Sequence, residues 1–241
     1  ERNSCALYES HPIEAFKSSL NGNTLIRSSK GCHTYRYLPE INKSLTKEDG
    51  FLVEYFNVTE HGNDFISSKV LTGSKFWIFE GFAKDIIGGD EKPDILVKFS
   101  CTYTPNITGE HNFEIFAIGK SKLLIDETEI IDNWTNTSPG DAFFAHGTTS
   151  KRGSKVLKKN KSYKIEIQYK FEGNFPAIYI GCQPPDKIDL MDEALNIAKE
   201  VEQVVLMVGT NSDWETEGND RVDFNLPGKQ NELIEKELEI N

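Results

Sequence analysis

The stretch Ile95-Leu-Val-Lys-Phe-Ser-Cys-Thr-Tyr103 decides the fold of the middle of this chain. From Ile95 to Tyr103 every second side chain is apolar, and most of those between are polar. This period-2 pattern is typical of a strand with one buried face. The stretch YKIEIQY (163–169) repeats the alternation. Cys101 falls on the apolar side of its strand, which predicts a small buried side chain.

Shorter apolar runs continue the pattern on both sides of these two strands. They are FLVEYF (51–56), HNFEIFAI (111–118), KLLID (122–126), EIID (129–132) and AIYIG (177–181). Turn-rich stretches such as 88–90 and 138–141 separate them. Many short strands with one apolar face each predict a sandwich or barrel of antiparallel sheets.

The two ends of the chain show a different sequence pattern, in which predicted helices alternate with predicted strands. The expected elements there are a helix capped by Ser10 with Pro12 in its first turn, a strand at 24–27, a helix after residue 185, a strand at 204–209 and a helix over 229–239. The run VVLMVG (204–209) is continuously apolar, as in strands buried on both faces of a parallel sheet. This alternation of helix and strand is typical of α/β domains.

Each end holds too few elements to bury a core alone, whereas a domain is easily inserted at a surface loop. We therefore predict a mainly β chain, with an antiparallel β-sandwich inserted between two pieces of an incomplete α/β sandwich domain. The pieces are 1–47 and 185–241, and the inserted sandwich is 48–184. The sheet of the outer domain is expected to be completed by chain beyond these 241 residues.

Composition excludes several classes of partner. The formal net charge is -11, which would repel nucleic acid or an anionic membrane surface. No apolar run approaches the roughly 20 residues needed to span a bilayer. The four cysteines form no C-x-x-C pair and the five histidines have no metal-ligand spacing, so neither a metal nor a cofactor is expected.

The compartment stays open. Widely spaced cysteines fit free thiols in a reducing setting, whereas N-x-[ST] sites matter only in a secreted protein. Such sites occur at Asn42, Asn57, Asn106, Asn133, Asn136 and Asn160.

The loop 210–227 is the stretch of the chain richest in functional polar side chains. It follows the carboxyl end of the predicted strand 204–209, where α/β proteins place functional residues. Its carboxylates stand beside Trp214 and Arg221; they are Asp213, Glu215, Glu217, Asp220 and Asp223. Carboxylates with an aromatic fit glycosidase chemistry, and oxygen ligands also fit calcium, although the spacing is not that of an EF-hand. An ordinary solvated acidic loop is the third interpretation. The glycines of a dinucleotide-binding turn are missing.

The segment 204–234 resembles the C-terminal sandwich domain of glycoside hydrolase family 3 β-glucosidases. The start of the chain, from 6–16 to 29–32, is similar to the part of that domain before its insertion. The β block resembles the protective-antigen-like domain that many fungal members carry there. That similarity lies in the stretches 50–56, 107–134 and 143–154.

The resemblance implies a retaining β-glucosidase that acts on terminal β-D-glucosyl residues of small oligosaccharides or aryl glucosides. The family's E-G-x-D-R loop is Glu217 to Arg221 here, so Glu217 is the acid/base candidate and Glu215 the runner-up. Family members usually carry an aromatic where this chain has Asn219. Trp214 and Arg221 are expected to support the loop by packing and ion pairing, and direct contact with substrate is the alternative.

The resemblance places the nucleophilic Asp in an N-terminal (β/α)8 barrel of the same enzyme, so this chain alone is expected to be inactive. The sequence does not decide whether the full enzyme is a homo-oligomer, or whether its specificity is that of a β-glucosidase or a β-xylosidase.

The inserted sandwich suggests two further expectations. Related domains in yeast adhesins hold calcium with adjacent Asp residues, but no Asp-Asp pair occurs between 50 and 182, so calcium-dependent sugar binding is not expected. In the loop 138–147, Phe143 and Phe144 are adjacent aromatics. Either one ring fills the end of the sandwich and the other is incidentally exposed, or one is a sugar platform that limits substrate length. The alternative function is a non-catalytic carbohydrate-binding module.

Overall fold

The computed structural model describes residues 10–20, 22–77, 94–172, 175–215, 220–221 and 223–240. The chain divides into two compact units. The first comprises 1–34, 188–210 and 223–241, and the second comprises 35–187 and 211–222.

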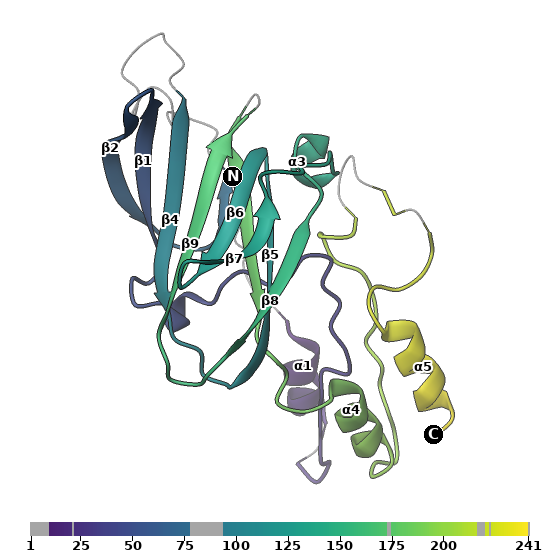
Figure 1. Ribbon diagram of the computed structural model, residues 1–241. Coiled ribbons are helices and arrows are strands. Elements are labelled where there is room, and N and C mark those ends of the chain that lie inside the picture. Colours follow the sequence, from purple (N-terminus) through teal and green to yellow (C-terminus); the bar gives the residue numbers. More distant parts are fainter. Residues whose placement is uncertain are drawn as a thin grey trace. The chain divides into compact units, whose positions relative to one another are not determined.

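The second unit is built of antiparallel strands (Figure 1). Its strands are β1 (Phe51–Thr59), β2 (Gly62–Leu71), β3 (Lys75–Trp77), β4 (Ile95–Tyr103), β5 (Gly109–Ala117), β6 (Gly119–Ile125), β7 (Thr128–Asn133), β8 (Lys151–Leu157), β9 (Tyr163–Phe171) and β10 (Ala177–Gln183). Two short helical turns accompany them, η1 (Lys43–Leu45) and α3 (Ala142–Ala145).

The strands form two sheets. One has the order β2-β1-β4-β9-β6-β7 and the other the order β3-β10-β5-β8, and every pair of neighbours is antiparallel. The predicted antiparallel β-sandwich is therefore confirmed. β2 was not predicted, because none of its residues is buried and its apolar side chains follow no regular period.

The core lies between the sheets and follows the predicted alternation. Along β4, Val97 and Phe99 are fully buried, and the pair Cys101 and Ile165 joins β4 to β9 in register. Phe99 stacks on Phe76 of the opposite sheet at 4.9 Å between ring centroids. Each large apolar side chain buried in this way contributes about 1.5–3 kcal/mol. Cys101 is only 3% exposed, as predicted.

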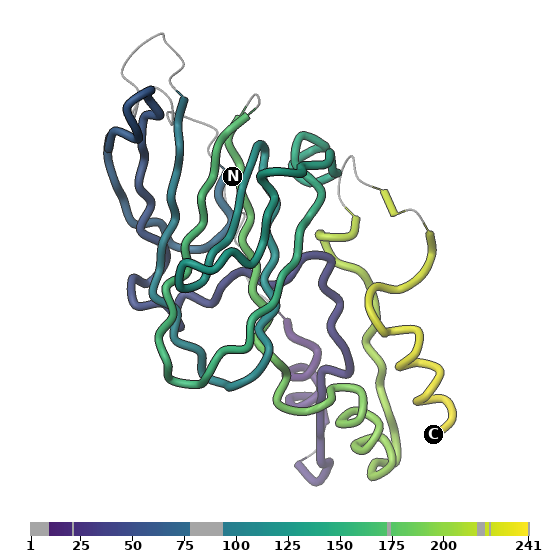
Figure 2. Tube along the Cα trace, viewed as in Figure 1, coloured from purple at the N-terminus to yellow at the C-terminus, as the bar shows by residue number. Residues whose placement is uncertain are grey.

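The four-stranded sheet is covered on its outer face as well. In β5 the residues from Phe113 to Ala117 are all buried, so both faces of this strand are packed. A second apolar cluster, which contains Phe116 and Phe143, lies on the outer side. The strap, which we define as residues 35–41, also pairs with this sheet: Glu40 bridges to Gly181, and Cys182 donates its N–H to the Pro39 carbonyl at 2.8 Å. Figure 2 follows the chain through the strap into β1.

The first unit contains helices α1 (Pro12–Ser19), α4 (Leu190–Ala198) and α5 (Gln230–Leu238), close to the three predicted positions. Met191 and Ala194 of α4 form a small core with Leu233 of α5. Asp189 caps α4 by accepting the N–H of Asp192 at 3.0 Å. The predicted cap of α1 is wrong: His11 occupies the cap position, and no side chain caps the helix.

The two predicted strands of the first unit are absent from its described residues. Neither 24–27 nor 204–209 is a strand, and Val205 and Met207 are 61% and 59% exposed. A strand exists only when a neighbour accepts and donates its backbone hydrogen bonds. The described part of this unit offers no other strand, so the apolar run 204–209 forms no sheet, although its Leu206 packs against the small core of α4 and α5.

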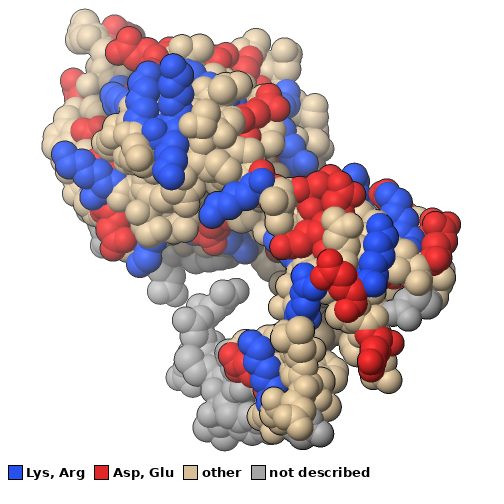
Figure 3. All heavy atoms as spheres, turned by 90° about the horizontal axis from the view of Figure 1, so that it is seen from below, with Lys and Arg blue, Asp and Glu red and all other residues tan. Residues whose placement is uncertain are grey.

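Surface charge is mixed in the view of Figure 3, where Lys and Arg side chains lie among Asp and Glu. Among the described residues, no helix combines the length and the apolar character needed to cross a membrane.

Candidate active site

The acidic loop 210–227 is described in part. Residues 216–219, which include the acid/base candidate Glu217 and Asn219, lie outside the described residues. Just before them the chain turns tightly, because the Asn211 carbonyl accepts the N–H groups of Trp214 and Glu215 at 3.0 and 3.3 Å. The Asn211 side chain also accepts the N–H of Asp213 at 3.0 Å. The backbone leading to Glu217 is therefore fixed by local hydrogen bonds.

An ion pair spans the undescribed part of the loop. Arg221 Nε lies 3.1 Å from Glu215 Oε2, and the Arg221 side chain is 27% exposed. Trp214 is half-buried. The structure thus pairs Glu215 with Arg221, so the runner-up carboxylate is already bound by a cation.

In the first unit, the chain segments at the two ends of this loop are held together by Gln230, which the sequence did not single out. Its side-chain amide donates to the carbonyls of Gly209 and Pro227, both at 2.9 Å, and its oxygen accepts the Gly209 N–H at 2.8 Å. Gln230 is only 3% exposed. A buried amide with these partners closes the base of the loop.

The two adjacent phenylalanines lie in opposite environments. Phe143 is 6% exposed and packs edge-on against Trp77, with ring centroids 4.9 Å apart. Phe144 is 72% exposed. One ring therefore fills the end of the sandwich while the other projects into solvent, and Phe144 is the side chain of this pair that a ligand can reach.

The backbone of this loop is strained. Phe143, Phe144 and Ala145 have φ angles of 54°, 57° and 62°, in the left-handed region, although none is a glycine. This conformation costs roughly 1–2 kcal/mol for each residue with a side chain. The loop is held by hydrogen bonds at its base, where the Gly140 N–H donates to the Gly147 carbonyl at 2.9 Å. Strain of this kind clusters at functional sites.

Arg36, which no sequence pattern singled out, contacts both the acidic loop and the loop 138–147. One nitrogen donates to the Asp213 carbonyl at 3.1 Å, and another pairs with the carboxylate of Asp141. Beside it lies a cavity of about 630 Å³. Its lining comprises Arg36, Tyr37, Glu114, Gly140, Asp141, Ala142, Thr148, Thr149, Ser150 and Arg152.

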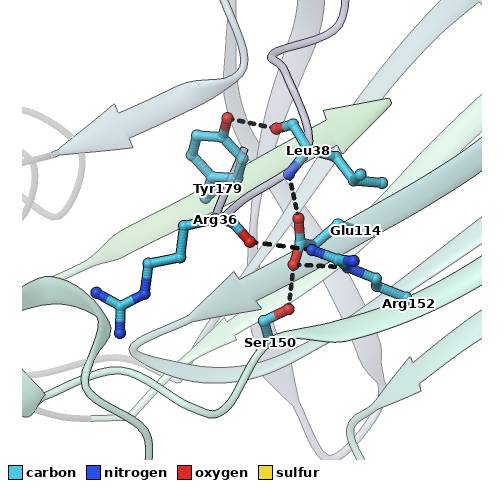
Figure 4. A network of polar contacts seen from close by, with 6 residues as sticks. All are labelled: Arg36, Leu38, Glu114, Ser150, Arg152 and Tyr179. Atoms are coloured by element: carbon cyan, nitrogen blue, oxygen red, sulfur yellow. Dashed lines mark hydrogen bonds and ion pairs between the residues drawn. The ribbon is translucent and has the colours of Figure 1, made fainter. Parts of the chain in front are cut away.

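The inner wall of this cavity is a buried carboxylate, shown in Figure 4. The Glu114 side chain is 1% exposed and accepts hydrogen bonds from the Leu38 N–H, the Ser150 hydroxyl and Arg152 Nε. Three donors compensate the cost of burying the charge.

Two tyrosine side chains, Tyr37 and Tyr179, accompany the strap. Tyr179 donates its hydroxyl to the Leu38 carbonyl at 2.7 Å. Burial raises the pKa of Tyr37 to about 12, which keeps its hydroxyl protonated at neutral pH. The strap is thus fastened to the sheet through both its backbone and the side chains beneath it.

Metal ligands do not gather in the described part of the chain, where no group of three or more His, Cys, Asp or Glu side chains is placed to hold an ion.

Known proteins resemble this chain over almost all of its length. A PA14 domain is recognised over residues 79–174. The probable β-glucosidase I of Emericella nidulans is 29% identical over 98% of this chain, and a β-glucosidase of Rhizobium radiobacter is also 29% identical over 98%. The chain spans only 29% and 28% of the lengths of these relatives.

A solved structure shares the fold. The crystal structure of a β-glucosidase from Kluyveromyces marxianus superimposes with a TM-score of 0.75 and 22% identity, covering 88% of this chain and 27% of that one. The resemblance of this chain to the β-glucosidases is thus confirmed over nearly its whole length, and its middle part matches a PA14 domain.

Proposed function

We propose that this chain is the part of a retaining β-glucosidase that supplies the acid/base carboxylate, Glu217, and an insert that limits substrate length. The observation that carries the proposal is the match of 98% of the chain to proteins named β-glucosidases, of which it spans less than a third. A chain of this extent is one part of a larger enzyme, and the nucleophile would come from the barrel domain.

The proposed chemistry needs two carboxyl groups. Glu217 would protonate the leaving oxygen as the nucleophile attacks, and would then activate the water that releases the sugar. In retaining enzymes the two carboxyl groups stand roughly 5–5.5 Å apart. A chain without the second carboxylate cannot complete this reaction, so the chain alone would be inactive.

The ion pair of Glu215 argues against this side chain as the acid/base group. One oxygen of Glu215 is bound by Arg221 at 3.1 Å, which gives this side chain a structural part in the loop. An acid catalyst must present its proton to the substrate instead. Glu217 follows two residues later, beyond the ordered turn at Asn211.

Phe144 is the proposed platform for the distal sugar. Its ring is 72% exposed in a loop whose backbone is strained yet anchored, so little entropy is lost when a sugar packs on it. Phe143, in contrast, fills the core and has a structural role.

The experiment replaces Glu217 and Glu215 by Ala in the complete enzyme. We expect Glu217→Ala to lower kcat/KM for glucosides with poor leaving groups by about 10²–10⁴-fold and to spare activated ones more. Azide, a small nucleophile that needs no general base, should restore turnover of the activated substrates. Glu215→Ala should lower both rates alike.

Two results would count against the proposal. If Glu215→Ala gave the leaving-group dependence and azide rescue, the acid/base role would move to Glu215. If neither variant did, and the isolated chain bound glucan tightly and only with calcium, the chain would be a carbohydrate-binding module.

A further inference from the structure

We propose that Arg36 is a positioning residue that fixes the acid/base loop relative to the Phe144 loop. This inference rests on the proposed function and deepens it. Arg36 lies 177 residues before Asp213 and 105 before Asp141, and its guanidinium contacts both. Asp213 stands four residues before Glu217, and Asp141 three before Phe144. One side chain therefore holds both loops close to their functional residues.

Arg36 is itself held from a rigid base. Its carbonyl accepts a hydrogen bond from Arg152 at 3.0 Å, and its guanidinium lies 5.3 Å from the centre of the Tyr37 ring. Two residues on, Leu38 is bound through its N–H to the buried Glu114 (Figure 4). The backbone that carries the guanidinium is thus fastened to the four-stranded sheet.

The contacts suit arginine in particular. A planar guanidinium presents several N–H groups in a fixed fork, so it can serve a carbonyl and a carboxylate at once. The Arg36 side chain is 21% exposed, which limits the competition from water. A lysine could keep the ion pair with Asp141 but would lose the fixed geometry toward the Asp213 carbonyl.

The consequence for catalysis follows from distance. A misplacement of about 1 Å in a reacting group can cost on the order of 10²-fold in rate. If the clamp is removed, the turn at 211–215 loses the hydrogen bond that joins the Asp213 carbonyl to the strap. Glu217 would then sample more positions, and proton transfer to the leaving oxygen would slow. The Phe144 loop would lose the same anchor.

The kinetic test uses Arg36→Ala and Arg36→Lys in the complete enzyme, with aryl glucosides that span good and poor leaving groups. Lys164→Ala is the matched control, since that cation also pairs with a sandwich carboxylate, Glu166, at 3.2 Å. We expect Arg36→Ala to lower kcat/KM about 10-fold for poor leaving groups and less than about 2-fold for activated ones. Arg36→Lys should fall between, and Lys164→Ala should change neither. An equal loss for all leaving groups would overturn the inference.

A second measurement does not depend on catalysis. Hydrogen exchange at Trp214 and Glu215, whose N–H groups are bonded to Asn211, should be faster in Arg36→Ala and unchanged in Lys164→Ala. Unchanged exchange in Arg36→Ala would disprove the clamp even if the proposed function is right. If exchange responds while Glu217→Ala shows no leaving-group dependence, the clamp stands and the acid/base assignment fails.

Discussion

The Leu38 N–H donates a hydrogen bond to the carboxylate of Glu114, 76 residues further along the chain, on the outer face of the four-stranded sheet. This contact connects the strap to the sandwich and lies beneath the cavity that Arg36 borders. Burial of the carboxylate makes the contact strong, since hydrogen bonds to a charged group contribute more than neutral ones.

Replacing Glu114 by Gln should destabilise the sandwich by about 2–3 kcal/mol. The amide removes the charge that three donors share, and its NH₂ group faces one of them. Chemical denaturation measures the loss. Glu110→Gln is the control, because that exposed side chain on the same strand has a single donor, Ser154, at 2.8 Å. Equal stability of the two variants would show that the buried network is energetically neutral.

Replacing Ala145 by Gly should stabilise the protein by about 0.5–1 kcal/mol. Ala145 has φ of 62° and is exposed, so a glycine removes the steric cost without losing packing. The gain is smaller than the full steric cost because glycine also has more freedom in the unfolded chain. The midpoint of denaturation should rise.

The control for this change is Ala142→Gly, three residues earlier. Ala142 is 7% exposed and lies outside the left-handed region, so the same substitution should destabilise. A fall in stability of Ala145→Gly would mean that the left-handed turn carries no strain.

The sandwich was predictable from the sequence because long strands such as β4 and β9 alternate between buried and less buried side chains. The alternation from Ile95 to Tyr103 is a direct record of that burial. β2 was not predictable, since both of its faces are largely exposed and its Phe65 is 58% exposed. The run 204–209 was misjudged because apolar character shows that a segment can be buried, but not that partner strands are present.

The sequence could name candidate site residues only where a motif carried them. Glu217 stays a prediction, made because the segment from Glu217 to Arg221 resembles the family's E-G-x-D-R loop, a local feature. Arg36 and Asp141 are 105 residues apart in the sequence, and their spacing matches no helix or strand periodicity. Their pairing therefore could not be predicted from a sequence pattern. The opposite environments of Phe143 and Phe144 depend on the left-handed backbone, which their side chains disfavour and a sequence rule would not choose.

The stability of the protein should fall as the pH drops from about 7 toward 5.5, in part because of His111. This side chain is fully buried, its Nε2 has no hydrogen-bond partner, and burial lowers its pKa below the usual 6.5. As the pH falls through about 6.5, His111 therefore binds a proton in the unfolded chain but not yet in the folded chain. The contribution of His111 to the free energy of unfolding is fully present above about pH 6.5 and is lost as the pH falls below it. The limiting slope of this free energy is about 1.4 kcal/mol per pH unit.

Urea unfolding at pH 7.5 and 5.5 measures this dependence. His111→Gln should be less stable at both values but show a flatter pH dependence than the wild type. His61→Gln, at an exposed histidine, should keep the wild-type slope. An unchanged slope in His111→Gln would assign the effect to other groups.

Removing the Phe144 ring should weaken the binding of disaccharides and spare small aryl glucosides. We expect Phe144→Ala in the complete enzyme to raise KM for a disaccharide about 5- to 30-fold, since losing the apolar contact of one ring costs roughly 1–2 kcal/mol. Its kcat should change little, because a platform for the distal sugar binds ground state and transition state alike. A small aryl glucoside would be too short to reach the ring. Steady-state kinetics with both substrates measures the difference.

Phe65→Ala is the control for this prediction, because Phe65 is also an exposed phenylalanine of the sandwich, at 58% against 72% for Phe144. It should leave both substrates unaffected. Equal losses for disaccharide and aryl glucoside in Phe144→Ala would exclude the platform role, since a ring that contacts only the distal sugar cannot affect a substrate that lacks one. The exposure of Phe144 would then be incidental to the burial of Phe143.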